Sequence, residues 1–509
     1  MNSFINELKK ENNFTITENG AITHKTTLNA VYDLFALGGA YRNRSDDDCI
    51  LLFKKAFEQD EELALKCLFY LRDVRGGQGE RRFFRVCINW LAREYPEAAF
   101  RNLDNIPEYG RWDDLYCILG TKLENDALDI FAAQLNKDLV SLKESDREGV
   151  SLLGKWLKSE NASSYETKQL GNRTREYLGY SHKKYRKILS VLRTRINIVE
   201  KLMSEGQWDK IDFAKIPSKA GLIYRNAFAH NDLTKERYAI FMNDKETKVN
   251  ANTLYPYEIV NKVTSKIFND WSSYDFYKLN IDEIERRALN KYWDNQKDYL
   301  NGEPCKIMCV VDTSGSMTSK DAQKVAPIDV AISLGMYCGE RIGEPFKNYF
   351  ISFSSRPQLI EIEGVDFCDK VKRIYQKNLC DNTNLKAVFD MLKDMYIKGR
   401  VKEEDLPEQL IVISDMEIDC NSFWTNRTRM KTEMEMLRNE WASIGLKFPK
   451  LYYWNVDARH NNILDDFSNP NVTFVSGCSP VIFESVIRGK TGIQLMLEKL
   501  NSERYINIK

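Results

Sequence analysis

The chain has 509 residues, of which 43% are hydrophobic and 29% charged, a composition typical of globular proteins with more than one hydrophobic core. Because 74 Lys and Arg residues balance 74 Asp and Glu residues, nucleic-acid or membrane binding would have to come from a local patch. Eleven cysteines without CxxC pairs predict reduced thiols, and so a cytoplasmic protein. The four histidines lie far apart along the chain, which argues against a zinc site. No apolar run approaches the roughly 18 residues of a membrane helix, so we expect no membrane partner.

Residues 30–300 have the apolar periodicity of successive helices. Ser45 is predicted to cap the start of one of these helices. The glycine-rich segment 75–79 interrupts the pattern. It either closes a tight turn between helices or brings backbone N–H groups close to a phosphate. Few segments alternate with period two. We therefore predict an all-α, HEAT-like solenoid or ring over residues 1–300.

Residues 301–509 have a different pattern, which begins after the turn-rich segment 301–304. Short apolar strands are predicted at 306–311, 348–353, 409–414, 450–455 and 471–476. Helices are predicted around 323–341, 384–398 and 427–444. This alternation indicates a doubly wound, mostly parallel α/β domain over 301–509. Residues 358–363 follow a strand after a short turn, so we expect them to pair antiparallel at the sheet edge.

An Asp-x-Ser-x-Ser sequence follows the first of these strands. Asp312, Ser314 and Ser316 alternate, so an extended turn can direct all three side chains to one side, at the edge where such sheets bind ligands. One carboxylate and two hydroxyls suit Mg²⁺ or another hard divalent cation. Thr383 at a helix start and Asp415 at a strand end are placed to join them. The alternative is a capped loop with an unrelated surface Thr and Asp.

This set resembles the metal-ion-dependent adhesion site of von Willebrand factor A domains. The resemblance implies that Asp312, Ser314, Ser316 and Thr383 approach the metal directly or through water. It also implies that Asp415 assists from outside the coordination sphere. In that family an acidic side chain of a partner protein completes the coordination.

The helical part resembles the TROVE module of the Ro autoantigen family, in which a ring of helical repeats is closed by a von Willebrand A domain. The similar stretches are 71–82, 106–114 and 185–232, and they indicate a divergent Ro-like branch. The resemblance implies a small non-coding or misfolded RNA as partner, with single-stranded ends in the central hole and structured RNA on a basic outer face. Residues 240–300 match nothing in this family, and we expect a monomer.

The segment 168–201 is the candidate RNA-binding face, because ten Lys and Arg residues there stand against Glu176 and Glu200, with tyrosines between them. Basic and aromatic side chains together suit phosphate contact and base stacking. We expect RNA contacts from Lys168, Arg173, Arg175, Tyr180, Lys183, Lys184, Tyr185, Arg186 and Lys187. The alternative is a solvated helix face with its tyrosines in the core.

A second basic group is interleaved with acidic residues and predicts ion pairs between helices instead. Its members are Arg72, Arg75, Arg81, Arg82, Arg85 and Arg111, among Asp73, Glu80, Asp113 and Asp114. A metal held mainly by neutral hydroxyls activates water poorly, so we do not expect an enzyme. The sequence thus favours a non-catalytic RNA-binding scaffold or quality-control factor. The alternative is a protein-interaction scaffold whose metal captures a partner's acidic residue.

Overall fold

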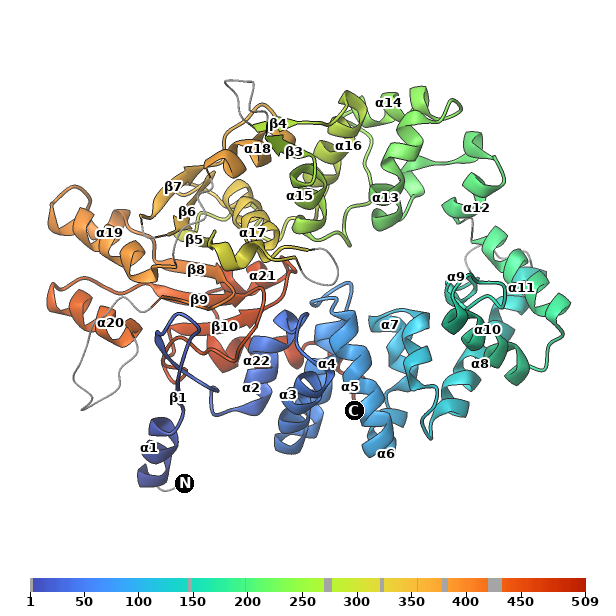
Figure 1. The fold of residues 1–509 in the computed structure, drawn as a ribbon, viewed down its shortest axis with the longest axis horizontal. Coiled ribbons are helices and arrows are strands. Elements are labelled where there is room, and N and C mark those ends of the chain that lie inside the picture. Colours follow the sequence, from blue (N-terminus) through green and yellow to red (C-terminus); the bar gives the residue numbers. More distant parts are fainter. Residues whose placement is uncertain are drawn as a thin grey trace.

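The computed structural model describes residues 3–144, 149–196, 198–269, 277–320, 325–354, 356–377, 383–419 and 433–509. Figure 1 shows a ring in which the helices of the first 300 residues follow an arc and an α/β domain fills the gap between the ends of the arc. Within the described ranges, no helix has both the length and the apolar character that crossing a bilayer requires.

The N-terminal part is rich in short helices. They are α1 (Ser3–Glu11), α2 (Ala30–Leu37), α3 (Asp46–Gln59), α4 (Glu61–Arg72), α5 (Arg81–Glu94), α6 (Pro96–Phe100), α7 (Ile106–Tyr109), α8 (Glu124–Lys143), α9 (Leu153–Trp156), α10 (Tyr165–Tyr177), α11 (His182–Arg195), α12 (Val199–Ser204), α13 (Ser218–His230), α14 (Lys235–Asn243), α15 (Pro256–Thr264) and α16 (Glu283–Asp294). Two antiparallel pairs accompany them: β1 (Phe14–Ile16) with β2 (Ile22–His24), and β3 (Ile267–Asn269) with β4 (Tyr277–Leu279). A helix-rich N-terminal part is confirmed, but the all-α prediction is wrong because the pairs β1–β2 and β3–β4 lie within it. The regular geometry of HEAT repeats is not shown.

Helix starts in this part follow from their cap residues. Ser45 Oγ accepts a hydrogen bond from Asp48 N at 3.1 Å, and the first turn of α3 is acidic, which favours the positive end of the helix dipole. Asp60 caps α4 in the same way by accepting from Leu63 N at 2.9 Å. The cap predicted at Ser45 is therefore confirmed.

The glycine-rich segment after α4 makes a tight turn. A Cβ on Gly77 would collide with the carbonyl oxygen of Tyr70, and Gly79 has a φ of +67° and lies directly against the Tyr255 hydroxyl. Only glycine combines this backbone freedom with such a close approach. The structure thus supports the turn rather than the phosphate interpretation of these glycines.

The C-terminal part is built on a six-stranded sheet with the order β10-β9-β8-β5-β6-β7. Its strands are β5 (Ile307–Asp312), β6 (Tyr349–Phe353), β7 (Gln358–Glu361), β8 (Gln409–Ser414), β9 (Lys450–Asn455) and β10 (Val472–Ser476). Its helices are α17 (Pro327–Arg341), α18 (Phe367–Lys377), α19 (Leu385–Ile397), α20 (Glu433–Ser443), α21 (Ile482–Ile487) and α22 (Gly492–Leu500). All neighbouring strands run parallel except β7, which pairs antiparallel with β6 at the edge, as predicted. A likeness to the von Willebrand A fold in particular is not shown.

Both ends of the helical arc pack on the α/β domain. At one end α2 packs on β10 and α4 on α22, and at the other end α15 packs on α17 and α18. A hydrogen bond and an ion pair strengthen the first contact. Gly39 N donates to Ser476 Oγ at 3.0 Å, and the C-terminal Arg504 forms a bidentate ion pair with the buried Asp73 at 2.7 and 2.8 Å. The α/β domain therefore closes the ring.

Candidate metal centre and nucleic-acid interface

Asp312, at the carboxyl end of β5, is a fully buried carboxylate. Its Oδ1 accepts a hydrogen bond from Ser314 N at 2.9 Å, and its Oδ2 accepts one from Ser414 Oγ at 2.5 Å. Burial and the nearby Asp415 carboxylate raise the pKa of Asp312 to about 7. Two neighbouring buried carboxylates are unfavourable unless positive charge lies close by.

The two serines of the loop bring their hydroxyls together. Ser314 Oγ lies 3.0 Å from Ser316 Oγ, and Ser314 is buried whereas Ser316 is partly exposed. The alternation of the sequence motif is consistent with this common direction. Together with Asp312 the hydroxyls form a hard-oxygen donor set with an open side toward solvent.

Asp415, directly after β8, is engaged at both oxygens. Oδ1 accepts from Glu417 N at 3.1 Å, and Oδ2 accepts from Arg459 Nη2 at 3.0 Å. Between these acidic residues, Met416 has a φ of 64°, a region that few residues other than glycine adopt. This arrangement suits a carboxylate that acts on a cation through its charge or a bridging water.

Thr383 lies against the loop that follows β8. Its hydroxyl is 3.2 Å from the Glu417 carbonyl oxygen and 3.1 Å from Asp419 Oδ1, and it accepts a hydrogen bond from Asn19 Nδ2 at 3.3 Å. The hydrogen bonds thus join Thr383 to residues 417–419 rather than to Asp312. Its role as a metal ligand stays a prediction.

The residues present fit a hard divalent cation. Asp312, Ser314 and Ser316 would hold it, and its charge would offset the repulsion between Asp312 and Asp415. Bound there, a cation would offer an acidic or phosphate oxygen a coordination position at the carboxyl edge of the sheet. Mg²⁺ as the identity of the cation stays a prediction.

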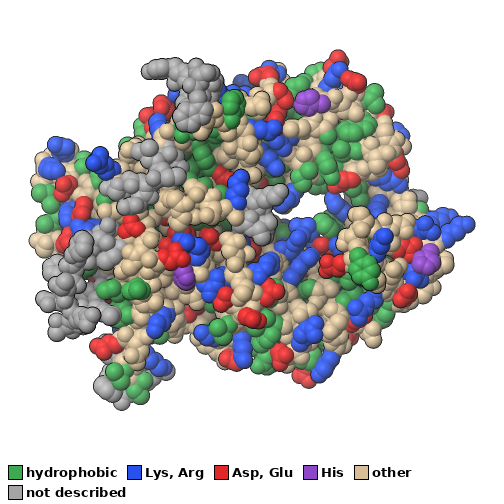
Figure 2. All heavy atoms as spheres, viewed as in Figure 1, with side chains coloured by type: hydrophobic (Ala, Val, Ile, Leu, Met, Phe, Trp, Pro, Cys, Tyr) green, Lys and Arg blue, Asp and Glu red, His purple; other side chains and the backbone are tan. Residues whose placement is uncertain are grey.

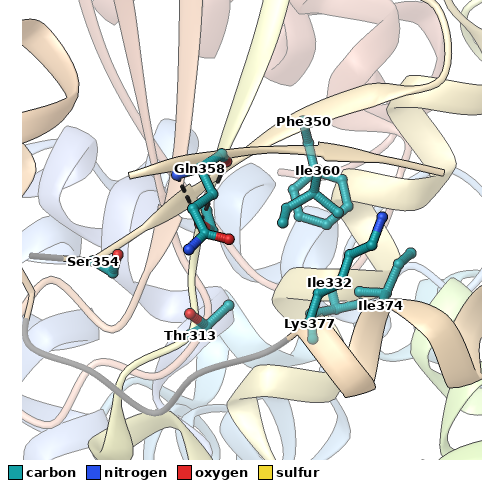
Figure 3. Close-up of a pocket in the computed structure, with 9 residues that line it drawn as sticks. Thr313, Ile332, Phe350, Ser354, Gln358, Ile360, Ile374 and Lys377 are labelled. Atoms are coloured by element: carbon teal, nitrogen blue, oxygen red, sulfur yellow. Dashed lines mark hydrogen bonds between the residues drawn. The ribbon is translucent and has the colours of Figure 1, made fainter. Parts of the chain in front are cut away.

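A small pocket lies beside this loop. Figure 3 shows Thr313 and Gln358 together on one side of it, and Phe350, Ile360 and Lys377 on the other. Its cavity volume of about 10 Å³ is close to what one water molecule requires. The pocket is therefore too small for an organic cofactor or substrate.

The candidate RNA-binding segment forms α10 and α11, at the end of the ring opposite the sheet (Figure 1). Six of its predicted basic residues are exposed, and Figure 2 shows Lys and Arg side chains gathered at this outer end. The exposed ones are Lys168, Arg173, Lys183, Lys184, Arg186 and Lys187. Within the described part of the chain, the four lysines form no ion pair, and Lys184 Nζ lies 4.0 Å from the centre of the Tyr180 ring. They leave an uncompensated basic surface.

The arginines of this segment are largely paired. Arg175 and Arg186 both lie 3.2 Å from the buried Glu160 carboxylate, and Arg173 forms an ion pair with Glu124. Arg175 is also mostly buried, with a side chain 13% exposed. These arginines fix helices to one another, so their predicted contribution to phosphate binding is smaller than that of the lysines.

Tyr185 has to be removed from the predicted RNA contacts. It is fully buried, and its hydroxyl donates to the Lys158 carbonyl at 2.9 Å. The buried face of α11 consists of Tyr185, Leu189 and Leu192, which recur at helical spacing. A ring in this position offers no face to a base, whereas Tyr180, which lies outside α11, is only partly buried.

The second basic group forms the predicted ion pairs at most of its arginines. Two of its arginines form no ion pair with the residues that the structure describes. Buried Arg72 binds Asp114 at 2.7 Å, and Arg85 binds the same carboxylate at 2.6 Å. Arg81 and Arg111 form no ion pair with any described residue. Burial lowers the pKa of Arg111, and the charge of Arg72 lowers it further. Asp113 and Asp114 oppose this shift, so Arg111 lies among charges of both signs.

Arg111 also stacks on an aromatic ring. Its guanidinium lies 4.8 Å from the centre of the Trp156 ring, so it joins the end of α7 to the end of α9. Figure 2 shows an opening through the molecule with Lys and Arg side chains along its rim, and in Figure 1 the space is bordered by α7, α9, α13 and α15. Sequence patterns did not point to Trp156, because the residues around it in space are distant along the chain.

Two family models match this chain. The first carries the description "Domain of unknown function (DUF2828)" and matches residues 17–129 and 157–301, about half of the chain. The chain belongs to this family. The second, "Domain of unknown function (DUF7788)", matches residues 306–503 of this DUF2828 protein. The matching descriptions are neither those of the TROVE module nor those of the von Willebrand A domain, so membership of the Ro family is not shown.

Two similar proteins accompany the family match. Uncharacterized protein L728 of Acanthamoeba polyphaga mimivirus is 27% identical over 520 residues, which cover 94% of this chain and 85% of the relative. The structure is also similar to the crystal structure of the Deinococcus radiodurans RO (RSR) protein. The superposition includes 94% of this chain and 100% of the other chain, with 13% sequence identity and a TM-score of 0.46. At that TM-score the second likeness carries no argument about function.

Proposed function

We propose that this DUF2828 protein binds RNA without catalysing a reaction on it, as a scaffold or quality-control factor for small non-coding or misfolded RNA. One observation carries the proposal. The exposed face of α10 and α11 presents Lys168, Lys183, Lys184 and Lys187 without an acidic partner among the described residues. Such a face attracts phosphates by charge and releases their counterions on binding.

The opening in the ring is the second element of the proposal. It suits a single strand, because Arg111 with Trp156 offers a cation and an aromatic ring on elements that border it. Structured RNA would lie on the lysines of the outer face and a single-stranded end would reach the opening. The resemblance of 71–82, 106–114 and 185–232 to the TROVE module supports this division.

The alternative of a protein scaffold is less well supported. If Thr383 completes the ligand set as the resemblance implies, a partner's acidic side chain has to reach the cation past this residue. The chain's own Asn19 already lies there and donates to Thr383 Oγ1 at 3.3 Å and to the Glu417 carbonyl at 2.7 Å. We therefore favour RNA over an acidic protein ligand.

The test is RNA binding by the full chain with Lys168, Lys183, Lys184 and Lys187 changed to Ala. Binding of a hairpin RNA with a single-stranded 3′ tail is measured by anisotropy at several salt concentrations. We expect weaker binding and a slope of log K against log salt that is flatter by roughly 0.7–0.9 for each phosphate that the variant no longer neutralises.

A matched control removes the same charge elsewhere. Lys215, Lys235, Lys398 and Lys402 are exposed but form ion pairs with neighbouring carboxylates, so their change to Ala is expected to leave the slope nearly unchanged. If the α10–α11 variant binds as tightly as the unaltered protein at every salt concentration, the face is ordinary solvated surface. RNA binding by this face is then wrong.

A further inference from the structure

A second group of ligand atoms lies near the Asp312 loop, where the N-terminal hairpin meets the α/β domain. Glu18, Glu417 and His460 each offer one ligand atom, and these atoms all lie within 4.8 Å of one another. Glu18 belongs to the turn between β1 and β2, Glu417 follows β8 and His460 follows β9. Three separate segments thus converge on one point.

We propose that Glu18, Glu417 and His460 bind a first-row transition-metal dication, such as Zn²⁺, Mn²⁺ or Co²⁺, which clasps the hairpin to the α/β domain. One imidazole nitrogen and two carboxylate oxygens suit these metals better than Mg²⁺ or Ca²⁺, which prefer oxygen ligands alone. The site is distinct from the oxygen set of Asp312, Ser314 and Ser316, and it does not depend on RNA binding.

The distances agree with shared coordination. His460 Nδ1 lies 2.9 Å from Glu417 Oε1 and 3.6 Å from Glu18 Oε1. Metal–ligand bonds of about 2.0–2.2 Å place adjacent ligand atoms about 3.0–3.5 Å apart. A small adjustment of the exposed Glu18 side chain therefore brings all three atoms to one ion.

The burial of Glu417 calls for a cation. Its side chain is fully buried, and within the described residues its ion-pair partner is His460, which is charged only when protonated. A buried carboxylate is costly without compensating positive charge. A dication at this point compensates it while His460 remains a neutral ligand.

The charges around the point leave room for a dication. Arg459 contacts Asp415 at 3.0 Å and Glu18 at 2.6 Å, and its one positive charge offsets the charge of Asp415. Glu18 and Glu417 then leave two formal negative charges. A single divalent ion neutralises them.

Outer contacts hold Glu417 in place for this role. Asn462 Nδ2 donates to Glu417 Oε1 at 2.9 Å, and Glu18 N donates to Glu417 Oε2 at 2.8 Å. Such hydrogen bonds orient a metal ligand and are a common feature of metal sites. The hairpin is fixed here as well, because Thr17 Oγ1 donates to the Ile418 carbonyl at 2.8 Å.

The experiment is Co²⁺ titration of the metal-free full chain, followed by visible absorption and calorimetry. We expect one Co²⁺ per chain to give the spectrum of a nitrogen-containing site, which a Co²⁺ in the Asp312 oxygen set would not give. His460→Ala or Glu18→Gln should weaken that binding by at least the roughly 10–100-fold that removal of an outer hydrogen-bond partner costs. Both side chains are exposed, so the variants should fold, which circular dichroism checks.

Two controls make the outcome decisive. His182 contacts Glu160 at 2.6 Å in a similar His–carboxylate pair, but Arg175 and Arg186 already neutralise that Glu, so His182→Ala should leave Co²⁺ binding unchanged. Asp312→Ala should also leave it unchanged, which separates this site from the oxygen set. If no Co²⁺ binds, or if His460→Ala and Glu18→Gln keep the affinity and spectrum of the unaltered protein, the proposal is overturned.

Discussion

Around Asp312 the charged groups lie buried at the carboxyl ends of β5, β8 and β9, whereas on α10 and α11 the lysines extend into solvent. The buried carboxylates have fixed partners from distant segments, such as Arg459 on Asp415 at 3.0 Å. The lysines have no such partners among the described residues. Charge interactions are strong and local in the first region but weak and screened by salt in the second. Changes in the first should therefore have the larger effects.

The largest expected effect comes from the cation at the sheet edge. Asp312→Ala removes the one carboxylate of the oxygen set, so Mg²⁺ binding by the full chain should be abolished in calorimetry. Thr318→Ala is the matched control, because Thr318 is an exposed hydroxyl of the same loop that donates to the Gly315 carbonyl. Unchanged Mg²⁺ binding in Asp312→Ala would show that the cation is bound elsewhere.

The next effect sharpens the contrast between buried and exposed charge within the helical arc. Asp114→Ala leaves the buried Arg72 without its partner, which should cost about 3–5 kcal/mol in the free energy of unfolding. Asp46→Ala breaks the exposed pair with Arg82 and should cost about 0–1 kcal/mol. Urea denaturation measures both. Equal costs for the two variants would contradict the contrast.

The sheet and the Asp-x-Ser-x-Ser loop could be predicted because both depend on local patterns. Apolar strands of fixed length set the sheet, and Asp312 follows the first of them. The environment of Asp415 could not be predicted, since Arg459, which binds it, lies in a distant segment. One indication was available: Arg459 and His460 follow β9 at the same carboxyl edge that pointed to Asp312.

In the basic segment the predicted lysines are exposed, as an RNA-binding face requires, whereas Tyr185 is buried. Counting charges and tyrosines in 168–201 could not separate the faces of α11. Tyr185 turned out to be core because it shares its helical face with Leu189 and Leu192. The pairing of Arg175 and Arg186 depends on Glu160, which precedes the segment. Sequence spacing alone does not show which helices will pack together.

A smaller effect follows from the raised pKa of Asp312. Without metal, the folded chain keeps a proton on Asp312 between the ordinary aspartate pKa near 3.8 and about 7, whereas the unfolded chain does not. Stability should therefore fall as pH rises through this window, and a bound cation should reverse the trend. Because the proton competes with the metal, Mg²⁺ affinity should fall by up to about tenfold per pH unit below 7.

Thermal melting from pH 5 to 8, with EDTA or with Mg²⁺, tests this dependence. Asp312→Asn serves as the control, since it removes the titrating group and keeps a side chain of similar size. The difference between the unaltered protein and this variant isolates Asp312 from other groups that titrate in the same range. A difference that stays constant across the range, in EDTA, would mean that Asp312 does not titrate there.

The smallest effect concerns two tyrosines of the basic segment, of which Tyr185 is buried in the core and Tyr180 is partly exposed. Tyr180 lies beside Lys184, so Tyr180→Ala should weaken RNA binding by about 1–3 kcal/mol if its ring stacks on a base, with little change in salt slope.

Tyr185→Phe removes only the hydrogen bond to the Lys158 carbonyl and should cost about 0.5–1.5 kcal/mol of stability. RNA affinity should not change in Tyr185→Phe, because the buried ring cannot reach a base. Anisotropy and urea denaturation on the same preparations measure the two effects separately. Weaker RNA binding in Tyr185→Phe at unchanged stability would place this ring on the surface and contradict the packing of α11.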